Sequence, residues 1–251
     1  MKIGIIGVGI VGSAIQHWFS KTHELFIHDP VKNTNIADVI DNVNVAYIAV
    51  PTPTNENDGS CDISIIKNIL DILPKGFIVI IKSTVIPGTT ESFHKNYPHL
   101  KIAYLPEFLV ERTHLNDFGN QEILVCGTHH KDVAKLILRH HKEAGVLKNS
   151  QFYHVTPTQA ELVKYSKNLF YAIKVIFSNQ MYDICEKLNE DWTDVYDIIT
   201  AKQSQPIGPS HLNPLFGSFR GFGGKCLPKD VKALNSLAES LECKYDLLDA
   251  I

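Results

Sequence analysis

The sequence predicts an α/β fold, in which a doubly wound parallel sheet is followed by an all-helical domain with a long connecting helix. Two observations support this prediction. Over residues 1–155, short apolar runs alternate with segments of helical spacing, as in a parallel sheet that is covered on both faces. Residues 158–190 contain neither glycine nor proline and can form one helix. We therefore expect two domains, 1–155 and 156–251.

The first domain begins with a run of strand formers and continues as alternating strands and helices. Helical spacing marks 11–19 and 62–73, and Ile66, Ile69 and Leu70 share one face of the second of these helices. Continuous apolar strands separated by helices are typical of the doubly wound α/β class. The strand candidates are 2–6, 25–28, 45–50, 77–81, 102–105 and 123–126.

The second domain is predicted to begin with a helix that starts at Thr156. Pro157 suits the first helical position, and Glu161 stands three residues beyond Thr158, as in a capping box. The helix is expected to run to about residue 190 and to be roughly 50 Å long. Further helices are predicted at 192–201, at 228–240 and from 245 onward, with a Pro/Gly-rich stretch at 205–224.

Composition argues against several classes of protein. The 251 residues include 24 Lys and Arg against 27 Asp and Glu, and this net charge of −3 does not suit a protein that coats nucleic acid. No apolar run approaches the ~18 residues of a membrane span, and the N-terminal apolar stretch lacks a signal-peptide cleavage pattern. The five cysteines are widely spaced without a C-x-x-C motif, so we expect a reducing cytosol and no metal site.

A glycine motif, G-V-G-I-V-G at 7–12, lies directly between the first strand and the first helix. Gly7 permits a tight turn, Gly9 lets the backbone approach a pyrophosphate, and Gly12 lets helix and strand pack closely. Asp29 closes the second strand, where a carboxylate holds the ribose hydroxyls and disfavours the 2′-phosphate of NADP. The pattern predicts a Rossmann-like NAD site, and the alternative is a glycine-rich turn beside a surface aspartate.

Further segments are predicted to contribute to the cofactor site. The helix N-terminus after the motif offers free N–H groups to phosphate, and loops at the carboxyl ends of strands line the ligand crevice of an open α/β sheet. V-P-T-P-T at 50–54 and S-T-V at 83–85 take that position, although each would serve equally well as a plain turn. Lys32 is a candidate for a cofactor phosphate or else a solvated lysine. The other expected cofactor contacts are Ile10, Val11, Val50, Pro51, Thr52 and Thr84.

The segment most informative for chemistry is G-F-G-G-K-C-L-P-K-D at 221–230. Pro228 suits the first position of a helix, so Cys226 lies just ahead of a helix N-terminus, whose dipole favours a thiolate. The glycines allow a ligand to approach the backbone, and Asp230 falls in the first helical turn near the cysteine. These features favour a reactive cysteine, and the alternative is a small buried side chain with a capping aspartate.

Together these motifs resemble the UDP-glucose/GDP-mannose dehydrogenase family. The further motifs V-P-T-P-T at 50–54, S-T-V-I-P-G-T-T at 83–90, P-E-F-L-V-E at 106–111 and E-L-V-K-Y-S-K-N at 161–168 follow the family's order from end to end. The resemblance implies an NAD-dependent, four-electron oxidation of a sugar nucleotide. The C6 alcohol would become a carboxylate through a cysteine thiohemiacetal and a thioester. UDP-glucose is the first expectation, while GDP-mannose and UDP-N-acetylhexosamines stay open.

The resemblance also implies roles for individual residues. Cys226 would be the nucleophile, and Lys164 would stabilise the developing oxyanion, with Asn168 on the same helical face. Asp230 would position or activate water, and Glu107 would serve the proton transfers. Without the resemblance, Lys164 and Asn168 would be read as a solvated polar stripe. Glu111 would share with Glu107 the proton transfers and the sugar and cofactor contacts, and Thr84 would orient the water or the cofactor. The implied sugar-nucleotide contacts are Glu107, Phe108, Leu109, Lys164, Asn168, Arg220, Gly221, Phe222 and Gly223.

Three departures from the family pattern bear on activity. Pro206-Ile207-Gly208 stands where the family commonly has Arg-Ile-Gly, so a phosphate-contacting arginine is missing unless Arg220 replaces it. Arg112 stands where a glycine often follows the second glutamate. The family normally has a third, Rossmann-like domain that helps to hold the substrate nucleotide, and this chain stops within the helix expected to lead to it.

The expected partners are a sugar nucleotide and a second copy of the chain, bound through the 156–190 helix, with no nucleic acid and no membrane. Two rival hypotheses remain. One is an NAD-binding protein that keeps Cys226 and Lys164 but binds sugar nucleotide too weakly for turnover. The other is an assembly module whose missing domain comes from another chain. The retained set of Cys226, Lys164 and Asp230 favours the enzyme, and the short C-terminus favours the rivals.

Overall fold

The computed structural model describes residues 1–240 except 57, 148–150 and 202–222. The chain divides into two compact units, Met1–Asn55 with Cys61–Lys164, and Glu56–Ser60 with Tyr165–Ile251. The predicted Pro/Gly-rich stretch, apart from its last two residues, and the predicted helix from 245 lie outside the described residues.

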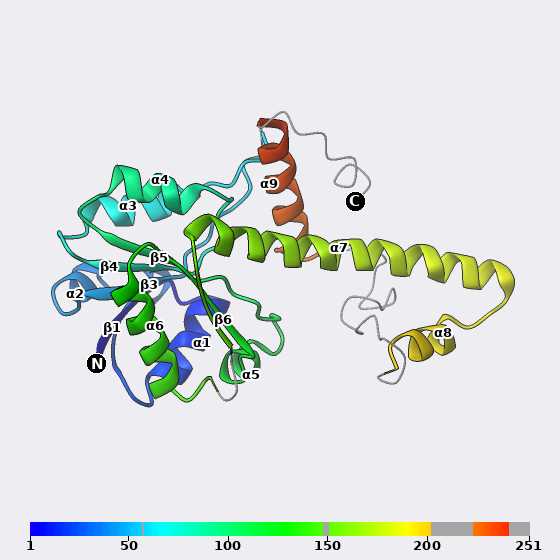
Figure 1. Cartoon of the computed structure of the whole chain (residues 1–251), viewed down its shortest axis with the longest axis horizontal. Helices are drawn as coiled ribbons and strands as arrows, with labels where there is room; N and C mark the ends of the chain where they lie inside the picture. The colour runs from blue at the N-terminus through cyan, green and yellow to red at the C-terminus, as the bar shows by residue number, and fades with distance from the viewer. Residues whose placement is uncertain (57, 148–150, 202–222, 241–251) are drawn as a thin grey trace. The chain divides into compact units, whose positions relative to one another are not determined.

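Within the described residues, the first unit is built on a seven-stranded sheet in the order β2-β1-β3-β4-β5-β6-β7 (Figure 1). All six predicted strands are present, and pairing is parallel from β2 through β5. Because β1 lies between β2 and β3, the winding reverses there, and such a reversal opens the ligand crevice of a Rossmann-like sheet. The strands are β1 Lys2–Ile6, β2 Glu24–His28, β3 Val45–Ile48, β4 Ile78–Ile81, β5 Lys101–Tyr104, β6 Ile123–Gly127 and β7 Gln151–Val155.

Two features of the sheet go beyond the prediction. β6 pairs antiparallel with β5 through Tyr104 and Gly127, so the sheet is mostly rather than wholly parallel. β7 is an additional strand that runs parallel to β6 at the edge of the sheet. Its residues Q-F-Y-H-V are largely exposed or half-buried, and therefore lack the continuous apolar character of the inner strands.

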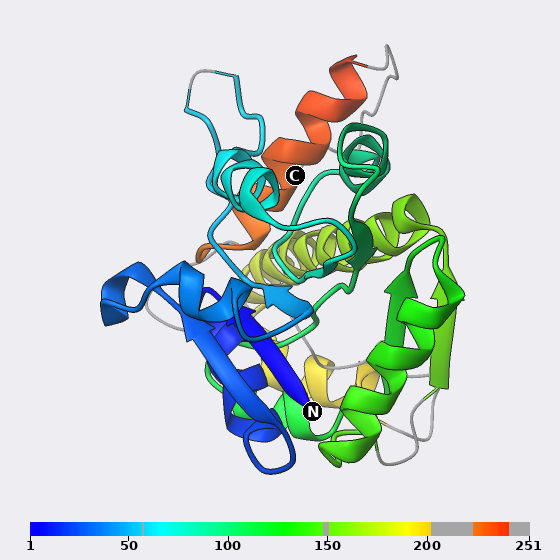
Figure 2. The same ribbon diagram turned by 90° about the vertical axis from the view of Figure 1, so that its left-hand side faces the viewer.

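Helices cover both faces of this sheet (Figures 1 and 2). α2 (Ile36–Ile40), α3 (Ser64–Ile72) and α4 (Thr89–Asn96) share one apolar core with one face, and α1 (Ile10–Phe19), α5 (His114–Gly119) and α6 (Lys131–Glu143) share a second core with the other. Alternation along each strand supplies both cores, because Ile81 belongs to the first and its neighbour Ile80 to the second. The doubly wound fold is thus confirmed.

The predicted long helix is α7 (Pro157–Leu188), which starts in the first unit and continues into the second. The second unit also contains α8 (Trp192–Ile199) and α9 (Leu227–Ser240), as predicted. In the described part of the chain, no helix is long and apolar enough to cross a membrane.

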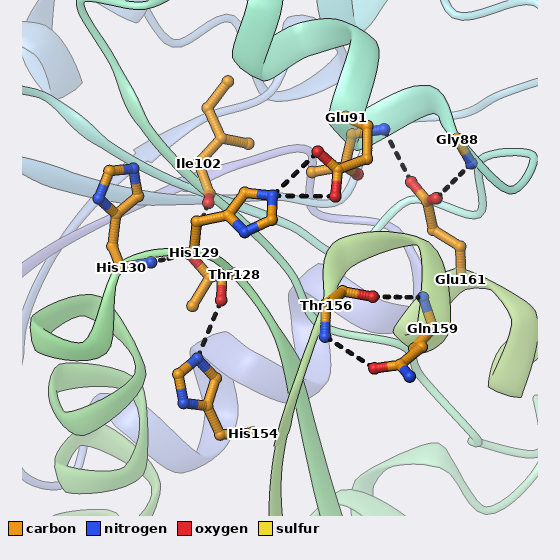
Figure 3. Close-up of polar contacts among 11 residues, drawn as sticks. Gly88, Glu91, Ile102, Thr128, His129, His130, His154, Thr156, Gln159 and Glu161 are labelled. Carbon is orange, nitrogen blue, oxygen red and sulfur yellow. Dashed lines mark hydrogen bonds and ion pairs between the residues drawn. The ribbon is translucent and has the colours of Figure 1, made fainter.

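The N-terminus of α7 is capped differently from the expectation. Gln159 donates its N–H to Thr156 Oγ1 at 3.3 Å, and Thr156 donates its N–H to Gln159 Oε1 at 3.1 Å, which makes a reciprocal capping box (Figure 3). Glu161 is therefore not the capping partner of Thr158. Its carboxylate accepts the N–H groups of Gly88 at 2.7 Å and Thr90 at 2.8 Å, at the start of α4.

Candidate active site

The glycine loop between β1 and α1 admits no side chain at two of its three glycines. Gly7 has φ +89°, and a Cβ there would lie 2.6 Å from the Ala49 carbonyl oxygen. A Cβ on Gly12 would lie 1.9 Å from the carbonyl oxygen of Gly7. The first glycine therefore permits the turn and the third permits close packing of helix on strand, as the motif predicts.

The second glycine of the motif, Gly9, faces open space. No atom lies within 4 Å of the place that its Cβ would take, and Gly9 is the residue immediately before α1. No side chain caps this helix, and its first turn holds no acidic residue. Ile10 and Val11 therefore begin a helix whose positive end is open to an anion. These residues fit the pyrophosphate of a dinucleotide.

Asp29 directly follows β2 and binds the glycine loop. Val8 donates its N–H to Asp29 Oδ2 at 2.6 Å, and Val31 donates its N–H to Oδ1 at 2.9 Å. The bond from Val8 is the main cause that lowers the pKa of Asp29, and the positive charge of Lys32 adds to it. A carboxylate that stays ionised at this position suits the ribose hydroxyls of NAD. Lys32 itself is exposed.

The loops after β3 and β4 are joined by two side-chain hydrogen bonds. Thr52 donates its hydroxyl to the Thr84 carbonyl oxygen at 2.7 Å, and Ser83 donates its hydroxyl to the Val50 carbonyl oxygen at 2.7 Å. The structure thus brings together the V-P-T-P-T and S-T-V segments that the sequence assigns to one crevice. Pro51 between them is exposed.

A buried ion pair lies at the carboxyl ends of β4 and β5. Lys82 Nζ is 2.6 Å from Glu107 Oε2, and only 1% of the Lys82 side chain and 9% of the Glu107 side chain are exposed. Lys82 is absent from the sequence-based candidates, because a single lysine between a strand and a motif looks like any solvated lysine. Its position directly before S-T-V could have indicated it.

Residues 105–110, around Glu107, form a loop without regular secondary structure. Phe108 donates its N–H to Glu107 Oε1 at 2.9 Å, and the Lys164 Nζ lies 6.0 Å from the centre of the Phe108 ring. Leu109 packs against the core on the α1 face. Glu111 is exposed, and its carbonyl oxygen lies 2.9 Å from His114 Nδ1.

The second unit brings together residues that are 62 positions apart in sequence. Asn168, in α7, donates its side-chain amide to Asp230 Oδ2, in α9. Asp230 is buried, with 3% exposed, and Lys229 Nζ lies 3.0 Å from its other oxygen. Lys164 precedes Asn168 by four residues in α7. The Asn168 amide and the Lys229 ammonium group hold the carboxylate of Asp230 in one orientation.

Cys226 lies directly before α9, and its carbonyl oxygen accepts the Asp230 N–H at 2.9 Å, so thiol and carboxylate belong to one helical turn. The helix begins at Leu227, which makes Pro228 its second residue rather than its first. Among the four cysteines in the described residues, Cys226 alone is exposed. Burial raises the pKa of Cys126 to about 12, which makes that thiol inert.

Not every predicted site residue can be placed. Arg220, Gly221 and Phe222 lie outside the described residues, as does the 206–208 segment. Gly223 is partly exposed, ahead of Gly224, which has φ +77°. Over the described ranges, no group of three or more His, Cys, Asp or Glu side chains is arranged to hold a metal ion.

Fold and glycine loop together define a Rossmann-like dinucleotide-binding domain joined to a helical unit. Residues 30–144 match the NAD binding domain of the UDP-glucose/GDP-mannose dehydrogenase family, and residues 158–251 match its central domain. The chain belongs to the UDP-glucose/GDP-mannose dehydrogenase family, and NAD is the cofactor of its first domain. The glycine motif lies ahead of the matched residues and supports the same cofactor independently.

Curated relatives agree with the family. The chain is 32% identical over 230 residues to the UDP-glucose 6-dehydrogenase of Rickettsia prowazekii, covering 86% of this chain and 50% of the relative. It is 28% identical over 226 residues to the GDP-mannose 6-dehydrogenase of Pseudomonas aeruginosa, covering 82% of this chain and 49% of the relative. The chain thus spans about half the length of the curated relatives it matches.

Solved structures share the fold. A UDP-glucose dehydrogenase from Pyrobaculum islandicum superposes with a TM-score of 0.82 at 23% identity, over 99% of this chain and 66% of that one. A 3-hydroxyisobutyrate dehydrogenase from Mycobacterium tuberculosis superposes with a TM-score of 0.71 at 14% identity, over 99% of this chain and 90% of that one. Because the fold also occurs in that second enzyme, the argument for a substrate rests on site residues rather than on the fold.

Proposed function

We propose that this chain is an NAD-dependent sugar-nucleotide 6-dehydrogenase, which oxidises the C6 alcohol of UDP-glucose, or of a related sugar nucleotide, to a carboxylate. One observation carries the proposal: the buried hydrogen bond between Asn168 and Asp230, one helical turn from the exposed thiol of Cys226. A protein that only binds NAD has no need of such a set. Membership of the dehydrogenase family supports the same reaction.

The reaction divides into four steps. Oxidation of the alcohol gives an aldehyde, and the Cys226 sulfur adds to the aldehyde carbon to form a thiohemiacetal. A second oxidation converts the thiohemiacetal into a thioester, and water then cleaves the C–S bond, which releases the carboxylate and restores the thiol. NAD held at the glycine loop would accept one hydride in each oxidation, and a second NAD would replace the first NADH between the two oxidations.

Cys226 and Asp230 would serve the covalent and hydrolytic steps. The exposed sulfur of Cys226, directly before α9, would add to the aldehyde carbon, and a thiolate is the nucleophilic form of cysteine. Asp230, held by Asn168 and Lys229, would hold a water for attack on the thioester and take its proton. Cys226 directly precedes α9 and Asp230 lies in its first turn, so the backbone keeps the two residues close together.

Lys164, Glu107 and Thr84 would serve the alcohol and aldehyde stages. An ammonium group stabilises the oxyanion that develops at C6 and would be supplied by Lys164. Glu107 would direct proton removal from the alcohol, through a water that Thr84 helps to orient. We assign sugar-nucleotide contacts to Phe108, Leu109 and the 220–223 segment, and cofactor contacts to the glycine loop, Asp29, Lys32, residues 50–52 and Glu111.

Turnover with a panel of sugar nucleotides tests the proposal. The protein is incubated with NAD and each of UDP-glucose, GDP-mannose and UDP-N-acetylhexosamines, and NADH is measured by absorbance. We expect two NADH per sugar nucleotide with one member of the panel. Cys226→Ser should abolish the second oxidation, while Cys185→Ala, a change at a buried cysteine in α7, should keep it.

Two results would contradict this reading. Full turnover by Cys226→Ser would refute the nucleophile. Absence of turnover on the whole panel, with NAD binding intact by calorimetry, would favour the alternative of an NAD-binding assembly module.

We further propose a homodimer that forms through α7. Four large apolar side chains stand seven residues apart along this helix: Val163, Phe170, Phe177 and Ile184 are 38%, 58%, 41% and 50% exposed. A seven-residue apolar repeat is the pattern of helices that pair along their length. Phe177→Asp should convert a dimer into a monomer in sedimentation velocity, whereas Glu186→Ala, also on α7, should not. A dimer that survives Phe177→Asp would exclude this interface.

A further inference from the structure

Lys82 is a buried cation, and its position at the end of β4 explains why it pairs with Glu107. It directly follows β4, and Glu107 follows β5 by three residues. The two strands are parallel neighbours, with Ile81 opposite Tyr104, so the residues after them emerge side by side. Lys82 Nζ then lies 2.6 Å from Glu107 Oε2, with both side chains almost fully removed from solvent.

Both oxygens of Glu107 are engaged. Oε1 accepts the N–H of Phe108 at 2.9 Å, and Oε2 faces Lys82. On its other side, the Lys82 ammonium lies 6.0 Å from the centre of the Phe118 ring in α5. Burial lowers the pKa of His141, in α6, to about 3, and the positive charge of Lys82 contributes to this shift. His141 is therefore neutral near pH 7. Glu107 is thus the anionic partner that the described contacts give to Lys82.

We propose that Lys82 is a positioning residue, which holds the carboxylate of Glu107 in one orientation at the carboxyl ends of β4 and β5. A buried carboxylate without a partner is strongly disfavoured, and a hydrogen-bonded pair of opposite charges fixes the geometry of both groups. The part of this inference that concerns the reaction rests on the proposed function, whereas the ion pair itself does not.

The consequence is that Lys82 and Glu107 act as one unit. Lys82 contributes to the reaction only through the carboxylate that it holds, so its removal matters only while Glu107 is present. Groups that act as a unit show non-additive losses when both are removed. This coupling separates a positioning role from a general contribution of Lys82 to folding.

A double-mutant cycle tests the coupling with Lys82→Met, Glu107→Gln and the double variant. Each single change should lower kcat by about a hundredfold, because a general base or its correct placement is worth that much. The double variant should also lose about a hundredfold, rather than the 10⁴-fold expected of independent residues. The KM for NAD should stay within about twofold, because these losses arise in the reaction step.

Thermal unfolding gives a second readout that needs no turnover. Lys82→Met leaves a buried carboxylate unpaired and should lower Tm more than the double variant does, because the double variant has no buried charge left. Lys82→Arg keeps a cation and should recover part of both Tm and kcat. Lys101→Met is the matched control: its Nζ lies 2.6 Å from Asp132, but the two side chains are 41% and 62% exposed, so Tm should change little.

Several results would overturn the proposal. Independent losses of kcat in the double variant would do so, as would a Lys82→Met variant of lowered Tm and unchanged kcat, or a double variant as unstable as Lys82→Met. A Lys82→Met chain that fails to fold while the double variant folds supports the coupling, and failure of both refutes it. If the unmodified chain turns over no sugar nucleotide, the proposed function fails, and the Tm cycle still decides whether the two residues are coupled.

Discussion

Gly9 and Gly12 stand three residues apart in one turn, yet their missing side chains serve different purposes. A Cβ on Gly12 would collide with the backbone of Gly7, whereas a Cβ on Gly9 would enter open space in front of α1. The first absence is needed for folding. The second is needed only when a ligand approaches the helix.

Alanine at each of these two positions should separate stability from NAD binding. Gly12→Ala should destabilise the first domain by more than about 2 kcal/mol, because the backbone must move to relieve the overlap. Gly9→Ala should change the free energy of unfolding by less than about 0.5 kcal/mol and still weaken NAD binding at least tenfold. Urea unfolding and calorimetry measure the two effects. An undiminished NAD affinity in Gly9→Ala would contradict the prediction that the pyrophosphate binds at Gly9.

The site could be predicted where its chemistry is local in sequence. The glycine loop, Asp29 and the start of α9 are each defined within a few residues, so their spacing carries the geometry. The contact between Asn168 and Asp230 depends on the packing of α7 against α9, and the spacing of the two residues in the sequence does not predict this packing. Lys82 was missed for the same reason, because only the pairing of β4 with β5 brings it to Glu107.

At the scale of elements, Glu161 joins α7 to α4. Its side chain is fully buried, and burial raises the pKa of Glu161, while hydrogen bonds from Thr90 and Gly88 act in the opposite direction. The two N–H groups that it accepts belong to the first turn of α4 and the residue before it. One carboxylate of α7 thus satisfies donors that would otherwise be orphaned at the start of another helix.

Removal of this carboxylate should be costly. Glu161→Ala leaves two N–H groups without their acceptor and should lower the free energy of unfolding by about 2–3 kcal/mol. Thr158→Ala is the control: it should change stability by less than about 0.5 kcal/mol, because the capping box uses Thr156 and Gln159. Equal losses of unfolding free energy in the two variants would contradict this assignment and favour a capping box between Thr158 and Glu161.

The elements themselves were predictable to the extent that they bury apolar residues. Inner strands such as β3 and β4 are continuous apolar runs, and their periodicity identifies them. A continuous apolar run has the same pattern in a parallel and in an antiparallel strand, so the antiparallel pairing of β6 with β5 could not be predicted. β7 has no buried face of its own, and the short helices α2 and α5 offer too few turns to show a period.

At the scale of the whole molecule, buried histidines predict sensitivity to acid. His140 and His141 are fully buried, and burial lowers the pKa of each from 6.5 to about 3. The unfolded chain therefore takes up protons below about pH 6.5 that the folded chain does not accept until about pH 3. Stability is complete above pH 6.5 and is lost as the pH falls through this window.

The size of the loss can be measured by urea unfolding. Between pH 7 and pH 5 the two histidines should together remove roughly 2–4 kcal/mol. His141→Phe, which places a third ring beside Phe19 and Phe118, should remove about half of this pH dependence. Substitution of the exposed His99 by Asn should leave it unchanged. A pH dependence that is identical in His141→Phe and the unmodified chain would contradict the assignment.

The carboxylate of Glu161 also affects which helix N-terminus can bind an anionic ligand. Both α1 and α4 begin after a glycine, and a helix beginning of this kind attracts anions. At α4 the protein supplies its own anion, tethered and buried, whereas α1 has no side chain in that place. An incoming diphosphate would have to evict Glu161 at one helix and nothing at the other. Of these two helix N-termini, only that of α1 is therefore left open to the diphosphate of the dinucleotide.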